Sequence, residues 1–306
     1  GLGLGSGLGS GSGLGLGLGS GSGLGLGLGL GLGLGLGFGS AASTSSKGAP
    51  SGTPSSADQS SCAVVTRSLT PLVVEVENFL NADEAAHIIA RAKPHMAKSG
   101  VALKDVDVGK AAKEFRTSSQ FFLPTVDDPI LERVDARVQS LTRLPISHAE
   151  YIQVLRYQHM EHYSAHHDFF NPKEYANNPQ MLREVEGGAR NRLATVFFYL
   201  NNVSQGGQTN FPRAGDSGLA RDVRPPVRDY FDCSKGLSVF PQEGKVIIFY
   251  SMLPNGEMDE MSLHGGCDVL EHDEKWSANF WLWNKPYHFL DAARVKATRD
   301  LQESWL

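Results

Sequence analysis

Residues 245–283 have the sequence KVIIFYSMLPNGEMDEMSLHGGCDVLEHDEKWSANFWLW, which contains two runs of β-branched and aromatic residues, Lys245–Tyr250 and Lys275–Trp283. Such runs favour β-strands, and the Gly, Pro, Asn and Asp between them favour turns. Three earlier runs share this character: Tyr151–Tyr157, Leu193–Leu200 and Leu237–Phe240. Several short strands separated by turn residues predict an antiparallel barrel or jelly roll.

The part of the chain before Tyr151 has helical character. We expect order to begin near Leu72 with a strand, followed by a helix whose start is marked by Asn81 and, three residues later, Glu84. A second helix is expected from about Pro129 to Leu144, where apolar residues recur at helical spacing. The predicted fold class is therefore α+β, mainly β: a double-stranded β-helix (jelly-roll) core with flanking N-terminal helices.

Residues 1–61 are Gly/Leu/Ser repeats followed by a Ser/Ala/Pro/Gly segment, a composition that predicts disorder and leaves residues 62–306 as the folded domain. Half of the only long apolar run is glycine, so no membrane span is predicted. The end of that run, Phe38–Ala42, is either the tail of a secretory h-region or plain low-complexity sequence. The first residue is glycine, so we interpret the N-terminus as incomplete and expect membrane association only through the missing part.

Charge and cysteine content exclude several classes of partner. The chain of 306 residues has a formal net charge of −5 with both signs interspersed, so nucleic acid is not an expected partner. Three cysteines without CxxC spacing, Cys62, Cys233 and Cys267, are too few for a disulfide scaffold and argue against a zinc ribbon. One disulfide remains open, and a monomer is expected. Two long stretches, residues 171–191 and 212–235, are predicted to be irregular lids or binding loops beside an active-site mouth.

The string Tyr163-Ser164-Ala165-His166-His167-Asp168 carries the first chemical signal. His166 and Asp168 are two residues apart and would share one face of an extended segment. A further neutral nitrogen from another strand would complete a facial triad of two histidines and one carboxylate, with open positions for a chelating cosubstrate and oxygen. His264 is the best candidate, because it follows an apolar strand and precedes a glycine turn. Alone, the HxD string also fits a surface loop with a helix-capping aspartate.

The remaining histidines are given other roles. His167 would point to the opposite face from His166, so we expect it to pack or to support the ligands. The others have no carboxylate partner at useful spacing and are expected to be exposed or structurally satisfied: His159, His162, His272 and His288.

Lys275 begins a strand in which alternation places Lys275, Ser277, Asn279 and Trp281 on one face. A lysine that faces the inside of a barrel needs an anion, and a dicarboxylate cosubstrate beside the iron site would supply one. The alternative is a surface lysine at the end of a strand.

Five motifs occur in an order that resembles the prolyl 4-hydroxylases of the plant and algal type, whose catalytic alpha subunits belong to the Fe(II)/2-oxoglutarate-dependent dioxygenases. They are RTSSQFFL from Arg116, LRYxxxxxYxxHHDFF, GGQTNFP, GLSVFP, and LHGGCxV with KWSANFW. The resemblance covers the chain from about Leu72 to Trp283. It implies hydroxylation of prolyl residues to 4-hydroxyproline with Fe(II), O2 and 2-oxoglutarate, which becomes succinate and CO2, and with ascorbate to rescue uncoupled cycles.

The same resemblance implies roles for single residues. Iron ligation falls to His166, Asp168 and His264, and Lys275 forms a salt bridge with the distal carboxylate of 2-oxoglutarate. Two further residues, Tyr157 and Thr209, occupy positions that hydrogen-bond the same cosubstrate. Trp281, on the Lys275 face of its strand, would then close the wall of the cosubstrate pocket. Tyr157 as a plain barrel aromatic and Thr209 as a turn hydroxyl are the alternatives.

On the substrate side, the resemblance places four residues near a peptide groove: Arg116, Ser118, Tyr163 and Arg192. Aromatic and Arg groups suit a proline-rich peptide or protein, because a polyproline II ligand loses little entropy on docking. Arg116 has the alternatives of capping a helix or pairing with an acidic neighbour. In similar algal and plant enzymes Cys233 and Cys267 occupy positions able to bridge, whereas two reduced thiols would suit a cytosolic protein.

Two departures from the family pattern stand out. Met160-Glu161 replaces the usual Gly-Gln pair, which puts the substrate preference in doubt. The interval from His264 to Lys275 is one residue longer than in the family pattern, and we place the additional residue around Glu271–Glu274.

Localisation is expected in the endoplasmic reticulum or secretory pathway, with the cytoplasm as alternative. Competing functions are the same chemistry on lysyl residues, free proline or another protein side chain, and a non-catalytic jelly-roll binding domain.

Overall fold

A computed structural model describes residues 63–215, 233–287 and 291–305 of the chain. Three predictions lie outside these residues: the disordered segment 1–61, the middle of the long loop 212–235, and His288. The described helices include none that is long and apolar enough to span a membrane.

The described strands form two antiparallel sheets, which confirms the predicted jelly-roll class. The larger sheet has eight strands in the order β1 (Val64–Leu69), β2 (Leu72–Val76), β10 (Val246–Tyr250), β7 (Arg192–Tyr199), β12 (Lys275–Trp283), β5 (Ile152–Tyr157), β4 (Ser119–Leu123) and β3 (Ala97–Lys98). The smaller sheet has the order β6 (Tyr163–His166), β11 (His264–Gly266), β8 (Thr209–Phe211) and β9 (Leu237–Val239).

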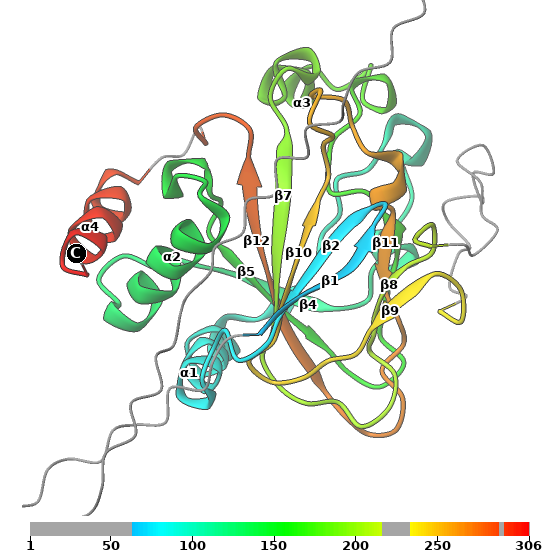
Figure 1. The fold of residues 1–306 in the computed structure, drawn as a ribbon. Coiled ribbons are helices and arrows are strands. Elements are labelled where there is room, and N and C mark those ends of the chain that lie inside the picture. The colour runs from blue at the N-terminus through cyan, green and yellow to red at the C-terminus, as the bar shows by residue number, and fades with distance from the viewer. Residues whose placement is uncertain (1–62, 216–232, 288–290, 306) are drawn as a thin grey trace, which may run out of the picture. The chain divides into compact units, whose positions relative to one another are not determined.

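The larger sheet is covered on both faces. Helices α1 (Ala82–Ala92), α2 (Pro129–Thr142) and α4 (Ala292–Glu303) lie on one side of it, and β8, β9 and β11 lie on the other (Figure 1). Side chains alternate along β7, so Val196 and Phe198 pack in the cluster under the helices, while Phe197 and Tyr199 pack in the cluster that includes the smaller sheet. Because both faces are buried, these strands have nearly continuous apolar sequences.

The two expected helices are present. At the start of α1, the Asn81 side chain accepts the Glu84 N–H at 2.9 Å while the Glu84 carboxylate accepts the Asn81 N–H at 3.0 Å. This is the predicted capping box. Helix α2 ends at Thr142, two residues before the predicted Leu144, since Arg143 has a left-handed backbone with φ of 60°.

Several expectations about order were wrong. Strand β1 precedes Leu72 and pairs with β2, and its largely exposed side chains left no apolar pattern to detect. Helix α4 adds a C-terminal helix to the predicted N-terminal ones, and buried Arg294 anchors it through Asp135 on α2 at 2.7 and 2.8 Å. The stretch 171–191 is not irregular, because it contains α3 (Pro179–Glu184) and two 3-10 turns that are too short to show periodicity.

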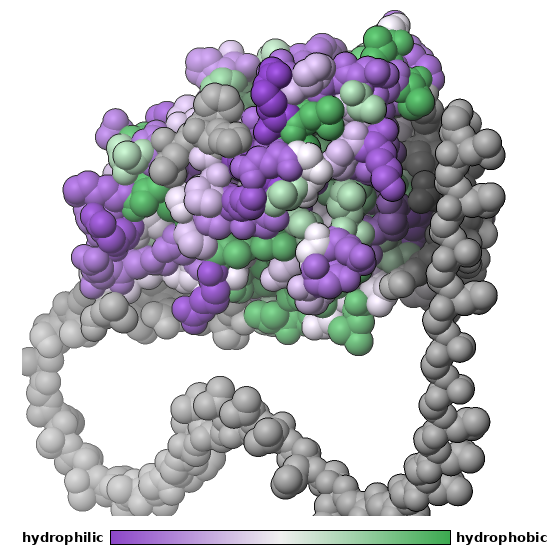
Figure 2. Space-filling model, turned by 90° about the horizontal axis from the view of Figure 1, so that it is seen from above, coloured by the Kyte–Doolittle hydropathy of each residue, from purple (hydrophilic) through white to green (hydrophobic). Residues whose placement is uncertain are grey.

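The surface seen from above mixes hydrophilic and hydrophobic residues without a single dominant apolar patch (Figure 2). Among the large apolar side chains that the described residues expose are Val64, Leu69, Met160 and Leu270. Scattered apolar side chains of this kind are ordinary on protein surfaces.

Candidate active site

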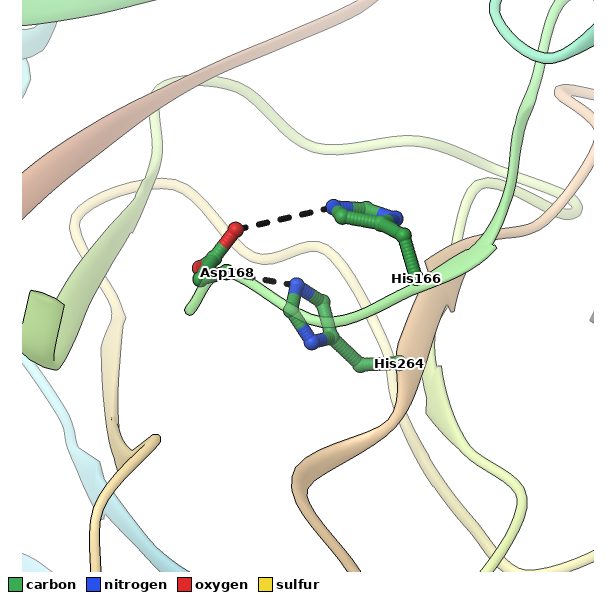
Figure 3. Close-up of side chains that lie close together, drawn as sticks. All are labelled: His166, Asp168 and His264. Carbon is green, nitrogen blue, oxygen red and sulfur yellow. Dashed lines mark ion pairs between the residues drawn. The ribbon is translucent and has the colours of Figure 1, made fainter. Parts of the chain in front are cut away.

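His166, Asp168 and His264 converge in the interior. His166 ends β6, Asp168 follows two residues later, and His264 begins β11 directly opposite His166 in the antiparallel pair. The Nε2 atoms of His166 and His264 lie 3.6 and 3.7 Å from the two oxygens of Asp168 (Figure 3). One ligand atom from each residue lies within 4.8 Å of the others, so the structure brings together the three predicted ligands.

The surroundings of His264 differ from the prediction. A 3-10 helix, η7 (Glu260–Ser262), precedes it instead of an apolar strand, and Gly265 and Gly266 belong to β11 instead of a turn. A Cβ at Gly265 would lie 3.0 Å from the Tyr163 carbonyl oxygen. Glycine therefore lets β11 approach β6 closely enough for the two histidines to share one site.

The protonation pattern suits a metal. Nδ1 of His166 lies 2.9 Å from the Ser164 carbonyl, and Nδ1 of His264 lies 2.9 Å from the Ser262 carbonyl. A carbonyl only accepts hydrogen bonds, so each Nδ1 donates, and this orients each ring with its Nε2 toward Asp168, the atom through which a neutral imidazole would bind a metal. Burial lowers the pKa of His264 to about 4. Burial opposes the charge of Asp168, but the adjacent His264 and His166 hold its pKa well below the usual range.

The Nε2 atoms of two imidazoles and one carboxylate are therefore available together as ligands. This donor set fits Fe(II) with open positions for other ligands.

Two neighbours support the ligands. Thr195 on β7 donates its hydroxyl hydrogen bond to Oδ2 of Asp168 at 2.6 Å, a contact that sequence analysis missed. Its only signal was a hydroxyl inside the apolar run Leu193–Phe198. Nε2 of His167 lies 3.1 Å from the Glu260 carbonyl, and burial lowers the pKa of His167 to about 3. Neutral His167 thus links the end of β6 to the turn that precedes His264.

A narrow cavity extends from the histidines to Lys275. Its lining comprises Leu155, Tyr157, Tyr163, His166, Phe197, Thr209, His264, Gly265, Gly266, Lys275 and Asn279. Lys275 is 2% exposed, and its Nζ lies 5.3 Å from the ring centroids of Tyr157 and Phe197. Burial lowers the pKa of Lys275 to about 7. Within the described ranges no carboxylate forms an ion pair with Lys275, so the cavity holds a buried cation without a counter-ion.

Polar groups along this cavity are held in place. Tyr199 OH lies 2.8 Å from Thr209 Oγ1, and Asn279 donates from Nδ2 to Gln153 at 2.9 Å. The sequence motifs assign neither Tyr199 nor Asn279 to the cosubstrate, although strand alternation correctly places Asn279 on the Lys275 face. The predicted cosubstrate residues Tyr157, Thr209 and Lys275 share this cavity, whereas Trp281 does not line it.

A wider cavity of 350 Å³ opens beside the triad. It is lined by Gly100, Val101, Ala102, Lys104, Arg116, Gln120, Phe122, Gln153, Tyr163, His166, His167, Asp168, Phe170, Tyr175, Arg192 and Trp281. Three of the four predicted substrate residues, and Trp281, are therefore here. Ser118 is not: it is fully buried and bonded to Ser99 at 2.9 Å and to Nε of Arg116 at 3.0 Å, so it orients Arg116 from behind.

Arg192 and Arg116, two cationic residues of this wider cavity, have different partners. Arg192 binds both carboxylate oxygens of Glu150 at 2.7 and 3.1 Å, and its guanidinium carbon lies 3.4 Å from the Trp281 ring centroid. Glu150 is a buried acid that sequence analysis did not identify. The Arg116 guanidinium lies 4.5 Å from the Tyr163 ring centroid, so Arg116 stacks on an aromatic ring in addition to its bond with Ser118.

Met160 and Glu161, which depart from the family pattern, lie in the segment between β5 and β6 and line neither cavity. Met160 has φ of 60°, in the left-handed region where the usual glycine would be unstrained, and its side chain is exposed. Glu161 pairs with Lys98 at 3.0 Å.

His162 has a carboxylate partner, contrary to the prediction, since its Nδ1 lies 2.8 Å from Asp268. Cys233 and Cys267 form a disulfide.

The extra residue before Lys275 falls in a turn. Glu271 has φ of 59°, and Lys275 stays in register opposite Tyr157 of β5.

The comparisons with known proteins agree with this site. The sequence model of the 2OG-Fe(II) oxygenase superfamily matches residues 152–283. Probable prolyl 4-hydroxylase 4 of Arabidopsis thaliana is 38% identical over 213 residues, which are 69% of this chain and 67% of that protein. Prolyl 4-hydroxylase 1 of the same plant is 36% identical over 227 residues, 71% of each chain.

A solved structure, the 2OG complex of viral collagen prolyl hydroxylase from Paramecium Bursaria Chlorella virus-1, aligns with a TM-score of 0.46 at 20% identity, over 69% of this chain and 95% of that one. The resemblance predicted from the five sequence motifs is confirmed by the family match and the plant relatives. The chain belongs to the prolyl 4-hydroxylase family of the 2OG-Fe(II) oxygenase superfamily.

Proposed function

We propose that the protein hydroxylates prolyl residues of a peptide or protein at C4, coupled to oxidative decarboxylation of 2-oxoglutarate to succinate and CO2. One observation carries the proposal: two histidines of a three-residue set of metal ligands line the same narrow cavity as a buried lysine that pairs with no carboxylate among the described residues. The plant relatives, which are named prolyl 4-hydroxylases, favour a prolyl residue as the target.

Different residues of the site would bind the metal and the cosubstrate. His166, Asp168 and His264 would hold Fe(II), and Lys275 would bind the distal carboxylate of 2-oxoglutarate, with Tyr157 and Thr209 as hydrogen-bond donors to it. When bound, iron and 2-oxoglutarate supply the oxygen activation and the hydroxylation. The aromatic rings around Lys275 exclude water, which strengthens the interaction between the ammonium and the carboxylate.

The wider cavity suits an extended, proline-rich segment. Nε1 of Trp281 and one Nη of Arg116 are buried hydrogen-bond donors that lack acceptors within the described part of the chain. A polyproline II segment makes no internal hydrogen bonds, so its carbonyl oxygens are free to accept from such donors. Glu150 balances the charge of Arg192, and the flat Arg192 guanidinium stacked on Trp281 offers a surface for pyrrolidine rings.

Three further properties belong to the proposal. Ascorbate sustains turnover by rescuing uncoupled cycles, the protein works as a monomer, and it resides in the secretory pathway. The Cys233–Cys267 disulfide favours this location over the cytoplasm, because disulfides persist in oxidising compartments.

The test uses the full chain with Fe(II), 2-oxoglutarate and ascorbate on polyproline, hydroxyproline-glycoprotein and collagen-type peptides. We expect a mass increase of one oxygen on prolyl residues and matching succinate formation. Asp168→Ala should abolish both, whereas His159→Ala, a histidine outside both cavities, should retain them. Hydroxylation of lysyl residues or of free proline instead would establish the alternative substrates. Absence of both Fe(II) binding and 2-oxoglutarate turnover would favour a binding domain.

A further inference from the structure

Thr195 makes a contact that the proposed reaction does not by itself require. It lies inside β7, opposite Phe249 of β10 and Trp281 of β12, and its side chain is fully buried. Its Oγ1 lies 2.6 Å from Oδ2 of Asp168. An ionised carboxylate only accepts hydrogen bonds, so the threonine hydroxyl donates.

The two oxygens of Asp168 consequently have different surroundings. Oδ2 receives the Thr195 hydrogen bond, while Oδ1 lies 3.6 Å from Nε2 of His166 without a hydrogen bond to another described side chain. We propose that Thr195 is a positioning residue that restricts Asp168 to binding the metal through one oxygen, Oδ1. This inference rests on the proposed function, since it concerns the same metal.

The restriction has a chemical purpose. Three protein donors leave positions for the two chelating oxygens of a 2-oxo acid and for O2. A carboxylate that turned to bind with both oxygens would fill one of these positions. A hydrogen bond from the rigid central strand of the sheet prevents that rotation, and it also orients the carboxylate before the metal arrives.

The test measures metal affinity with Co(II) as an oxygen-stable probe, titrated into the metal-free full chain and followed by calorimetry and visible absorption. Thr195→Val removes the hydroxyl with little change of shape, and Thr195→Ser retains it. Thr298→Val is the matched control, because Thr298 is a buried threonine on α4 whose hydroxyl has no hydrogen-bond partner among the described residues. His264→Ala removes a ligand outright.

Thr195→Val should raise the Kd for Co(II) roughly 10- to 100-fold, in the range typical of lost partners of metal ligands. Thr195→Ser and Thr298→Val should stay within about threefold of wild type, the scatter expected of a change that leaves the ligands in place. A Kd for Thr195→Val as low as that of the wild type would overturn the role of Thr195 and leave the metal site standing. Wild-type affinity no better than that of His264→Ala would instead overturn the proposed function. If Thr195→Val does not fold, Thr195→Ala against Thr195→Ser makes the same comparison.

An independent observation concerns Asn202 in the segment between β7 and β8. Asn202-Val203-Ser204 is an N-x-S sequon, and Asn202 is exposed in a stretch without regular secondary structure. The Asn202 side-chain oxygen accepts the backbone N–H of Glu243 at 3.0 Å, which fixes the orientation of the amide. Its Nδ2, the atom to which a glycan attaches, has no hydrogen-bond partner among the described residues.

We propose that Asn202 carries an N-linked glycan. The Cys233–Cys267 disulfide supports the proposal, because disulfide formation and glycan transfer occur in the same oxidising compartment. Neither cavity of the active site is lined by residues 200–206, so a glycan at Asn202 leaves both accessible.

The test expresses the full chain behind a cleavable leader in a eukaryotic cell, recovers it from the lumen of the endoplasmic reticulum, and maps its peptides before and after glycosidase treatment. We expect the Asn202 peptide to carry a hexose-rich glycan whose enzymatic removal leaves aspartate. Ser204→Ala should abolish the modification, Ser204→Thr should retain it, and Asn255→Gln, an exposed asparagine outside any sequon, should change nothing. An unmodified Asn202 peptide from lumenal protein would overturn the proposal.

Discussion

Replacing Lys275 by methionine should weaken 2-oxoglutarate binding far more than peptide binding. Lys275 is 2% exposed, and none of the described carboxylates pairs with it, so the cosubstrate would be the counter-ion of a buried cation. Removing one partner of a buried ion pair typically costs about 3–5 kcal/mol. The lower limit, about 3 kcal/mol, corresponds to roughly a 100-fold rise in the KM for 2-oxoglutarate, since each 1.4 kcal/mol is about a factor of ten.

The assay is succinate formation at varied 2-oxoglutarate and, separately, at varied peptide. Lys245→Met provides the matched control, because Lys245 is also buried but lies 3.5 Å from Glu75, and it lines neither cavity. We expect Lys275→Met to change the peptide KM by less than about threefold, as for a substrate that does not contact this side chain. Equal increases in both KM values, or a change in the 2-oxoglutarate KM no larger than that of Lys245→Met, would refute the anchoring role.

Proton linkage adds a pH signature at the same site. Burial lowers the pKa of Lys275 to about 7, and a bound carboxylate stabilises the ammonium and so raises that pKa. Above this pKa, the free enzyme must take up a proton to bind 2-oxoglutarate, so the Kd should rise by up to about tenfold per pH unit. Below it the ammonium is already charged and the dependence disappears. A Kd that stays flat as the pH rises from 7 to 9, or one that varies equally in Lys275→Met, would contradict this mechanism.

Three further predictions concern stability, each measured by urea unfolding of the metal-free protein. Cys267→Ser should destabilise by about 4 kcal/mol, the chain-entropy value for a disulfide that spans 34 residues, and wild type under reducing conditions should show the same loss. Met160→Gly should stabilise by roughly 0.5–1 kcal/mol, because the left-handed backbone at φ of 60° disfavours a side chain, and Met160→Ala should bring no gain. Asn81→Ala should cost about 1 kcal/mol through loss of the α1 cap, while Asn81→Asp should cost much less, and equal losses would argue against the capping box.

Local patterns predicted most of the elements that build the site. The Asn81 and Glu84 signal marked the start of α1, and the apolar runs gave β5, β7, β9, β10 and β12 to within a residue or two. These patterns are readable because capping bonds and strand alternation involve residues close in sequence. Elements without such a pattern were not predicted: β1 is mostly exposed, and α4 is held in place by a residue distant in sequence, Asp135.

The sequence alone determined the chemical groups and their order along the chain: the HxD string, the later histidine, and a lysine in phase on its strand. The tertiary structure decided which of these groups meet. It placed Thr195 against Asp168, paired Arg192 with Glu150, and put Trp281 in the wide cavity and not in the narrow one. The physical reason is that these contacts join strands separated by tens of residues, so they depend on sheet register and on the packing of both faces, neither of which any local pattern encodes.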